Sequence, residues 1–98
     1  MKLHPTKKQD FIHHLMHAIS FIKDEQEAWA FFSDLCTPAE LEAMADRWQV
    51  VPLLRQEIPY RTIHELTGVS VTTITRVARF LSMGNGGYTL IADRLEES

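Results

Sequence analysis

Hydrophobic residues recur at helical spacing along most of the chain, and the pattern predicts six short helices and no strand. Asp24 followed by Glu27 suits the N-terminal cap of the second helix. The apolar positions of the first two helices are Phe11, Ile12, Leu15, Ile19 and Ile22, then Ala28, Phe31, Phe32 and Leu35. An all-α fold is therefore expected, with residues 1–98 forming a single domain.

The clearest helix start lies at Thr37-Pro38-Ala39-Glu40. The Thr37 hydroxyl can accept from the amide of Glu40, the Glu40 side chain can reach back, and Pro38 suits the first helical position. The apolar face of this third helix comprises Leu41, Met44, Ala45, Trp48, Val51 and Leu54. Pro52 lies inside the helix and removes one backbone hydrogen bond, which predicts a bend near residues 49–51 rather than a break.

A helix-turn-helix pattern follows Pro59. A helix is expected over residues 60–67, and Gly68 suits its left-handed C-terminal end. Ser70 suits the N-cap of a helix that runs from residue 71 to about 83. In such a motif the first helix supports the second, whose N-terminal residues can enter the major groove of DNA.

Four apolar side chains occupy the interior positions expected of this motif: Ile63, Val69, Ile74 and Val77. Two positions depart from the usual pattern. His64 stands where a small residue usually packs against the second helix, and Thr67 stands where an apolar residue is common. Either departure is expected to weaken the packing or to change the angle between the two helices.

The glycine-rich run at residues 84–87 is expected to end the second helix of the motif. A last helix is expected over residues 88–96, with Leu90, Ile91 and Leu95 facing inward.

Ninety-eight residues arranged in short helices enclose little interior, although 45% of the residues are apolar. The size of the chain therefore favours an oligomer.

Cysteine content and hydropathy indicate a soluble, cytoplasmic protein. The single Cys36 excludes a disulfide within the chain and suits a reducing compartment. No signal peptide is recognisable, and no apolar run has the length that a membrane span needs, so no membrane partner is expected.

Charge is distributed unevenly along the chain, whose net charge is −3. The segment 47–82 is the only net-basic part, at +3, and contains five arginines and two glutamates. The arginines are Arg47, Arg55, Arg61, Arg76 and Arg79. No acidic residue occurs between Val69 and Leu81, so the field around the helix-turn-helix favours contact with phosphate.

The predicted outward face of the motif carries side chains suited to DNA. Arginine can bond guanine through two hydrogen bonds, threonine hydroxyls can bond bases or phosphates, and valine or threonine methyl groups can meet a thymine methyl. The candidate DNA-binding residues are Tyr60, Arg61, Ser70, Val71, Thr72, Thr75, Arg76 and Arg79. The alternative is a helical protein-interaction module in which the helix-turn-helix is only structural.

The joint pattern of the central segment resembles the Trp repressor superfamily. The matching features are Leu-x-Thr-Pro-x-Glu at 35–40, Arg47, Leu53-Leu54-Arg55, Gly68 and Thr73-Ile74-Thr75-Arg76. The FF-x-DLCT run at 31–37, Thr67-Gly68 and Gly84-Asn85 favour the YerC/YecD group of Trp-repressor-like proteins. The resemblance covers about residues 10–97. It implies an intertwined homodimer that regulates transcription, as a repressor, by docking two recognition helices on a double-stranded operator.

The same resemblance implies a position for a small-molecule effector. Thr37, Arg47 and Arg76 match three positions of the tryptophan pocket of the Trp repressor. The glycine against which the indole packs is replaced by Val77, whose side chain is expected to fill the indole slot. DNA binding without tryptophan is therefore expected, with no cofactor, and a different small corepressor is the alternative.

Other functional classes have weaker support in the sequence. His13 and His17 lie one helical turn apart and could chelate a metal, but no further ligand is positioned to complete a site, so no metal is expected. Cys36 has no specified catalytic partner, and the glycines at 84–87 follow a helix instead of opening one after a strand. An enzyme is therefore not expected.

Overall fold

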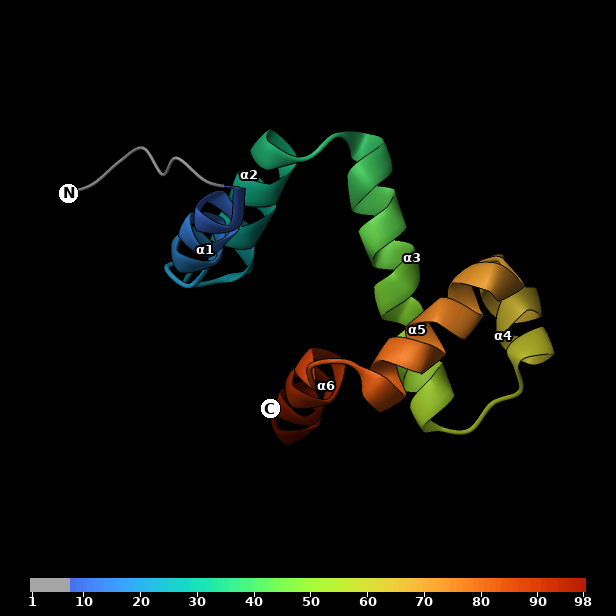
Figure 1. Ribbon diagram of the computed structural model, residues 1–98. Coiled ribbons are helices and arrows are strands. Elements are labelled where there is room, and N and C mark those ends of the chain that lie inside the picture. Colours follow the sequence, from blue (N-terminus) through green and yellow to red (C-terminus); the bar gives the residue numbers. More distant parts are fainter. Residues whose placement is uncertain (1–7) are drawn as a thin grey trace. The chain divides into compact units, whose positions relative to one another are not determined.

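A computed structural model describes residues 8–98, which form six α-helices and contain no strand (Figure 1). The helices are α1 (Lys8–Ile19), α2 (Glu25–Leu35), α3 (Pro38–Arg55), α4 (Tyr60–Thr67), α5 (Val71–Met83) and α6 (Gly87–Glu97). The all-α prediction is confirmed. The chain divides into two compact units, Met1–Thr37 and Pro38–Ser98, and the single domain stays a prediction.

The first unit contains α1 and α2. Asp24 is the N-cap of α2 as predicted, because its side chain accepts from the amide of Glu27 at 2.8 Å. The Glu27 side chain accepts from the amide of Lys23 at 3.0 Å, so the two acidic residues satisfy two backbone donors. The prediction for the first helix is partly wrong, since α1 ends at Ile19 and Ile22 lies beyond it.

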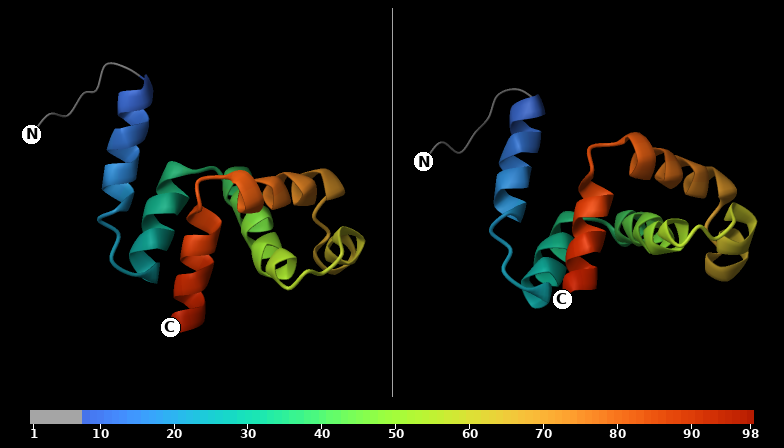
Figure 2. Two further views of the ribbon diagram at one scale, coloured as in Figure 1. Left: turned by 60° about the horizontal axis from the view of Figure 1, so that its bottom comes forward. Right: turned by 90° about the horizontal axis from the view of Figure 1, so that it is seen from below.

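The second unit is built around α3, which contacts α4, α5 and α6 (Figure 1). Both views in Figure 2 show α4 beside the N-terminal half of α5. Seven residues make up the buried core of the described chain, and all of them belong to this unit. They are Val50, Val51, Ile63, Val69, Ile74, Val77 and Ala92.

Helix α3 begins at Pro38, as predicted, and continues through Pro52 without a break. Pro52 cannot donate to the carbonyl four residues earlier, which destabilises an isolated helix. Val50 and Val51, directly before the proline, are both 0% exposed. Their burial contributes roughly 1.5–3 kcal/mol for each side chain, which offsets the missing bond and explains why the helix continues.

The C-terminal end of α3 is closed by two backbone hydrogen bonds. The amide of Ile58 donates to the carbonyl of Leu53 at 3.1 Å, and the amide of Glu57 donates to Leu54 at 2.9 Å. This pairing is the Schellman motif, in which one residue adopts a left-handed conformation. Glu57 takes that role with φ of 60°. The motif reverses the chain sharply and directs it into α4.

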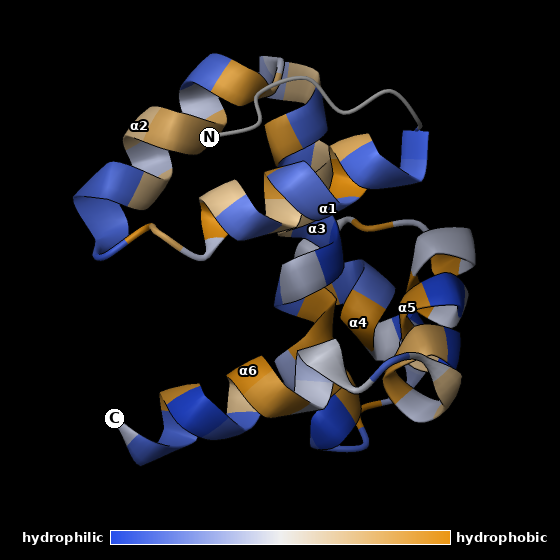
Figure 3. Cartoon of the chain, turned by 60° about the vertical axis from the view of Figure 1, so that its left-hand side comes forward, coloured by the Kyte–Doolittle hydropathy of each residue, from blue (hydrophilic) through white to orange (hydrophobic). Residues whose placement is uncertain are grey.

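Helix α6 is packed differently from the prediction. Ala92 is buried and Tyr88 is half-buried against the core, whereas the expected inward residues Leu90, Ile91 and Leu95 are 44–58% exposed. The prediction was wrong because the periodicity identifies an apolar face without identifying what covers it. In Figure 3, hydrophobic segments (orange) alternate with hydrophilic ones (blue) along α6.

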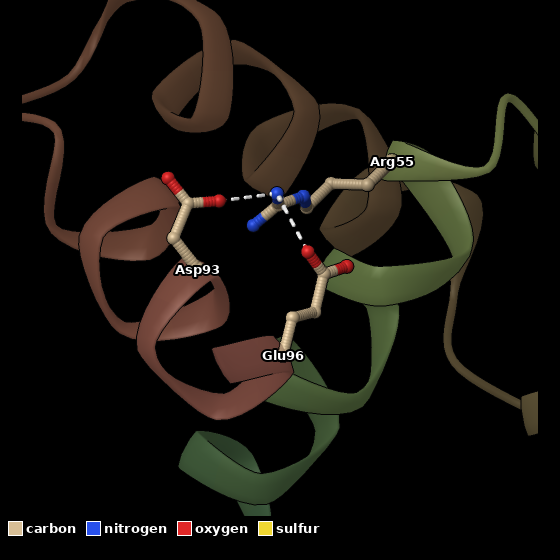
Figure 4. A network of polar contacts seen from close by, with 3 residues as sticks. All are labelled: Arg55, Asp93 and Glu96. Atoms are coloured by element: carbon tan, nitrogen blue, oxygen red, sulfur yellow. Dashed lines mark hydrogen bonds and ion pairs between the residues drawn. The ribbon is translucent and has the colours of Figure 1, made fainter. Parts of the chain in front are cut away.

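An ion-pair cluster joins α3 to α6 (Figure 4). Arg55 donates to Asp93 at 2.6 Å, and Glu96 lies 3.7 Å from the same guanidinium nitrogen. The hydrogen bond to Asp93 raises the pKa of Arg55 above its ordinary value; burial opposes the shift, and the charges of Asp93 and Glu96 raise the pKa further. The cluster therefore holds α6 against the end of α3 that precedes the helix-turn-helix.

Candidate nucleic-acid interface

Helices α4 and α5 form the predicted helix-turn-helix with the predicted bounds. Gly68 is the C-cap of α4 with φ of 76°, the left-handed conformation expected there. Ser70 is the N-cap of α5, and its hydroxyl oxygen accepts from the amide of Thr73 at 3.2 Å. Local capping chemistry therefore sets the length of the turn.

The interior of the motif is also confirmed. Ile63, Val69, Ile74 and Val77 are at most 5% exposed, and all four belong to the core of the second unit. Ile63 lies on α4, while Ile74 and Val77 lie on α5 one helical turn apart. Their spacing directs one face of α5 into the core, which leaves the opposite face to solvent.

Two polar residues of α4 contact the backbone of the turn. Nδ1 of His64 lies 2.7 Å from the carbonyl oxygen of Val69. The Thr67 hydroxyl donates to the carbonyl of Ile63 at 2.7 Å and accepts from the amide of Val69 at 3.1 Å. The expectation that these residues weaken the packing did not take their hydrogen bonds into account. The bonds to Val69 connect α4 to the residue that precedes the N-cap of α5.

The predicted DNA-binding residues all lie on exposed positions. They are Tyr60 and Arg61 at the start of α4, then Ser70, Val71, Thr72, Thr75, Arg76 and Arg79 at the cap and on α5. Thr73 is half-buried, and its hydroxyl accepts from Ser70 at 3.0 Å. Helix α5 thus separates a core face from a polar and basic face.

Arginines on this surface differ in their ion pairs. Arg61 lies 3.9 Å from Glu65 on the same helix, but its side chain is 91% exposed, and such a pair is readily exchanged for water or phosphate. Within residues 8–98 no ion pair involves Arg76 or Arg79. Both guanidinium groups can therefore bond an external anion or a base without breaking an internal salt bridge.

A groove of about 510 Å³ lies beside α5. It brings together three of the predicted effector-pocket residues, Arg47, Arg76 and Val77. Thr37, the fourth, belongs to the first unit. Val77 is 1% exposed, so it forms part of the groove wall and the core at once.

Three further residues line this groove and were not predicted: Thr73, Phe80 and Tyr88. Thr73 and Phe80 share a face of α5 with Arg76 and Val77, since these positions follow the spacing i, i+3, i+4 and i+7. That spacing was visible in the sequence. Tyr88 comes from α6 and stacks at a tilt on Trp48 of α3, with ring centroids 6.2 Å apart. Its place in the groove depends on the packing of α3, α5 and α6 and could not be predicted from the sequence of one helix.

The described residues contain neither a metal-binding cluster nor a membrane-spanning helix. Within the described range, no three His, Cys, Asp or Glu side chains are placed to hold a metal ion, and His13 and His17 lie together on α1. None of the described helices is both long enough and apolar enough to cross a bilayer.

A protein family and a known relative match most of the chain in sequence. The model of the family described as Trp repressor protein matches residues 10–96. The uncharacterized protein YerC of Bacillus subtilis (strain 168) is 40% identical over 84 residues, which cover 86% of this chain and 81% of YerC.

Solved structures agree with this match. A TrpR-like protein from Eubacterium eligens ATCC 27750 is 40% identical with a TM-score of 0.83, covering 91% of this chain and 92% of its own. A candidate Trp repressor from Staphylococcus aureus is 38% identical, also with a TM-score of 0.83, covering 89% and 87%. The chain therefore belongs to the Trp repressor family, within the Trp-repressor-like group that includes YerC.

Proposed function

We propose that this protein is a sequence-specific DNA-binding regulator of transcription, acting as a repressor. One observation carries the proposal: the exposed face of α5 has no acidic residue, and its two arginines form no ion pair with any residue of the described range 8–98. The helix enters the major groove with its N-terminal residues toward the bases, so Ser70, Val71 and Thr72 meet base edges. Family membership supports a regulatory role over an enzymatic one.

The regulator acts as a homodimer. Support comes from the first unit, where neither α1 nor α2 contains a buried residue. Its large exposed hydrophobic side chains are Phe11, Ile12, Met16, Phe21, Trp29 and Leu35. Apolar surface of this extent marks a protein interface, and a second copy can cover it symmetrically. A twofold protein then reads a pseudo-palindromic operator with two recognition helices.

A salt titration tests the proposed function. We expect the protein to bind one or a few genomic fragments in preference to random duplex in a gel-shift or polarisation experiment at two salt concentrations. Each phosphate contact releases counterions, so six or more contacts weaken binding roughly a thousandfold or more between 50 and 200 mM salt. If no fragment outcompetes random DNA at either concentration, specific regulation is refuted.

The second candidate is a helical protein-interaction module. The observation that favours it is the exposed apolar face of α6, formed by Leu90, Ile91 and Leu95. Such a module binds DNA weakly and without preference among sequences, whereas it retains partners at high salt because apolar burial is insensitive to screening. The salt titration therefore separates the two candidates.

DNA binding is proposed to need no tryptophan. The side chain of Val77 occupies the wall of the groove at the position where the family resemblance implies a glycine under the indole ring. In calorimetry, L-tryptophan should give no measurable binding heat with the wild-type protein, with or without DNA. The Val77→Gly variant is the matched control, and binding by this variant alone ties the exclusion to the valine side chain. Tight binding by the wild type refutes the proposal.

A further inference from the structure

The peptide groups of Val69 need hydrogen-bond partners that helix geometry does not supply. Val69 is 5% exposed and lies between the C-cap of α4 and the N-cap of α5. A backbone amide or carbonyl that is removed from water without a partner destabilises the fold. At Val69 both groups are satisfied by side chains of α4: the carbonyl by His64 and the amide by Thr67.

The hydrogen bond between His64 and Val69 has a definite direction. A carbonyl oxygen can only accept, so Nδ1 of His64 is protonated and donates at 2.7 Å. The backbone carbonyl of the same residue accepts from the amide of Gly68 at 2.8 Å. His64 thus contacts both ends of the left-handed turn, once through its backbone and once through its imidazole.

Thr67 has a more local role. Its hydroxyl donates to Ile63 within α4 and accepts from the amide two residues ahead. These bonds close the end of α4, and they do not extend beyond the amide of Val69. Among the described side chains, His64 alone reaches from α4 to the carbonyl on the far side of the turn.

This carbonyl belongs to the peptide group that leads directly into Ser70. The orientation of that peptide group therefore sets the direction in which α5 begins, and with it the positions of Ser70, Val71 and Thr72. Recognition of bases requires such side chains to be held within about 0.5 Å of their productive positions. A small rotation at the turn is consequently enough to weaken base contacts while leaving the core intact.

We propose that His64 is a positioning residue for sequence recognition: its hydrogen bond to the Val69 carbonyl sets the orientation of the N-terminal turn of α5. This inference rests on the proposed DNA-binding function. The polar contact replaces the close apolar packing usual at this point of a helix-turn-helix. His64 acts through the backbone and does not itself contact DNA.

Two variants at the same position test the role. His64→Leu keeps a side chain that suits a helix and removes the donor, whereas His64→Asn retains an N–H donor at the position of Nδ1. Affinity for the preferred fragment and for random duplex is measured for each, together with helicity and the melting temperature. His64→Leu should lower the ratio of specific to random affinity about tenfold, since the start of α5 is then no longer held in place and a contact that discriminates between bases is weakened. His64→Asn should keep the ratio within about twofold of the wild type, because it preserves the bond.

Amide hydrogen exchange gives a second readout that does not involve DNA. In His64→Leu, the amides of Val69 and Ile74 should exchange faster with solvent than in the wild type. The Val69 amide donates to the Thr67 hydroxyl within the turn, and the Ile74 amide donates to the Ser70 carbonyl in the first turn of α5. His64→Ala serves the same purpose if the leucine variant does not fold.

The outcomes separate this inference from the function on which it rests. If the wild type prefers no fragment over random DNA, the proposed function fails, and the role of His64 in recognition fails with it. If the wild type is selective and folded His64→Leu or His64→Ala keeps the full ratio, only the positioning role is refuted. A lower melting temperature with an unchanged ratio also refutes it, because the residue is then purely structural.

Discussion

Arg76→Ala should abolish the proposed preferential binding to operator DNA while the fold and the proposed homodimer stay intact. Arg76 is exposed on α5, lies in no ion pair of the described chain, and also lines the groove beside Arg47. A guanidinium that bonds a guanine through two hydrogen bonds contributes about 1–3 kcal/mol of discrimination. The proposed homodimer would use this contact twice, so the expected loss of specific affinity is roughly a hundredfold or more.

A matched charge loss elsewhere separates a direct contact from a general electrostatic effect. Arg94→Ala removes an exposed arginine of α6, outside the basic segment, and should leave specific affinity within about twofold of the wild type. Arg76→Lys keeps the charge but loses the planar fork that bonds a guanine, so it should keep the salt dependence and lose sequence preference. Normal operator binding by Arg76→Ala would remove this residue from the interface.

Ile63→Ala should lower the free energy of unfolding by about 2–5 kcal/mol, the range measured when buried isoleucine or leucine is cut to alanine. Ile63 is the buried residue of α4 and is 0% exposed in the core. Removing its side chain leaves a cavity between α4 and the rest of the second unit. A domain of this size has about 5–15 kcal/mol of stability in total, so the variant should lose a large part of it.

The same helix supplies the control. Leu66 lies three residues further along α4 and is 66% exposed, so Leu66→Ala should change the free energy of unfolding by less than about 0.5 kcal/mol. Urea denaturation followed by circular dichroism measures both variants, with protein concentration held constant because the unfolding of the proposed homodimer depends on concentration. Equal destabilisation by the two substitutions would contradict the assignment of the buried face of α4.

Local sequence signals determined the lengths of the helices that carry the candidate site. The bounds of α4 and α5 were predicted correctly because Gly68 and Ser70 act within their own turns, through a left-handed φ and a side-chain cap. The start of α3 at Pro38 was predicted for the same reason. The core positions of the motif followed from helical periodicity, and Ile63, Ile74 and Val77 are buried as expected.

Tertiary structure decided which partners these helices have. The periodicity of α6 placed Leu90, Ile91 and Leu95 on one apolar face, but only the packing shows that Ala92 and Tyr88 approach the core instead. The groove beside α5 likewise needs Tyr88, which lies eleven residues beyond Val77 along the chain and reaches it through the packing of α6. Neither arrangement follows from the pattern of a single helix.

The helix-turn-helix shows the same division within one motif. Its turn, caps and buried face were determined by the sequence alone, because each depends on residues only a few positions apart. The sequence also marked His64 and Thr67 as unusual, yet their effect depended on where the peptide groups of Val69 lie in space. Only the folded turn brings Nδ1 of His64 within 2.7 Å of that carbonyl, and so an apparent defect in packing becomes a hydrogen bond between α4 and the start of α5.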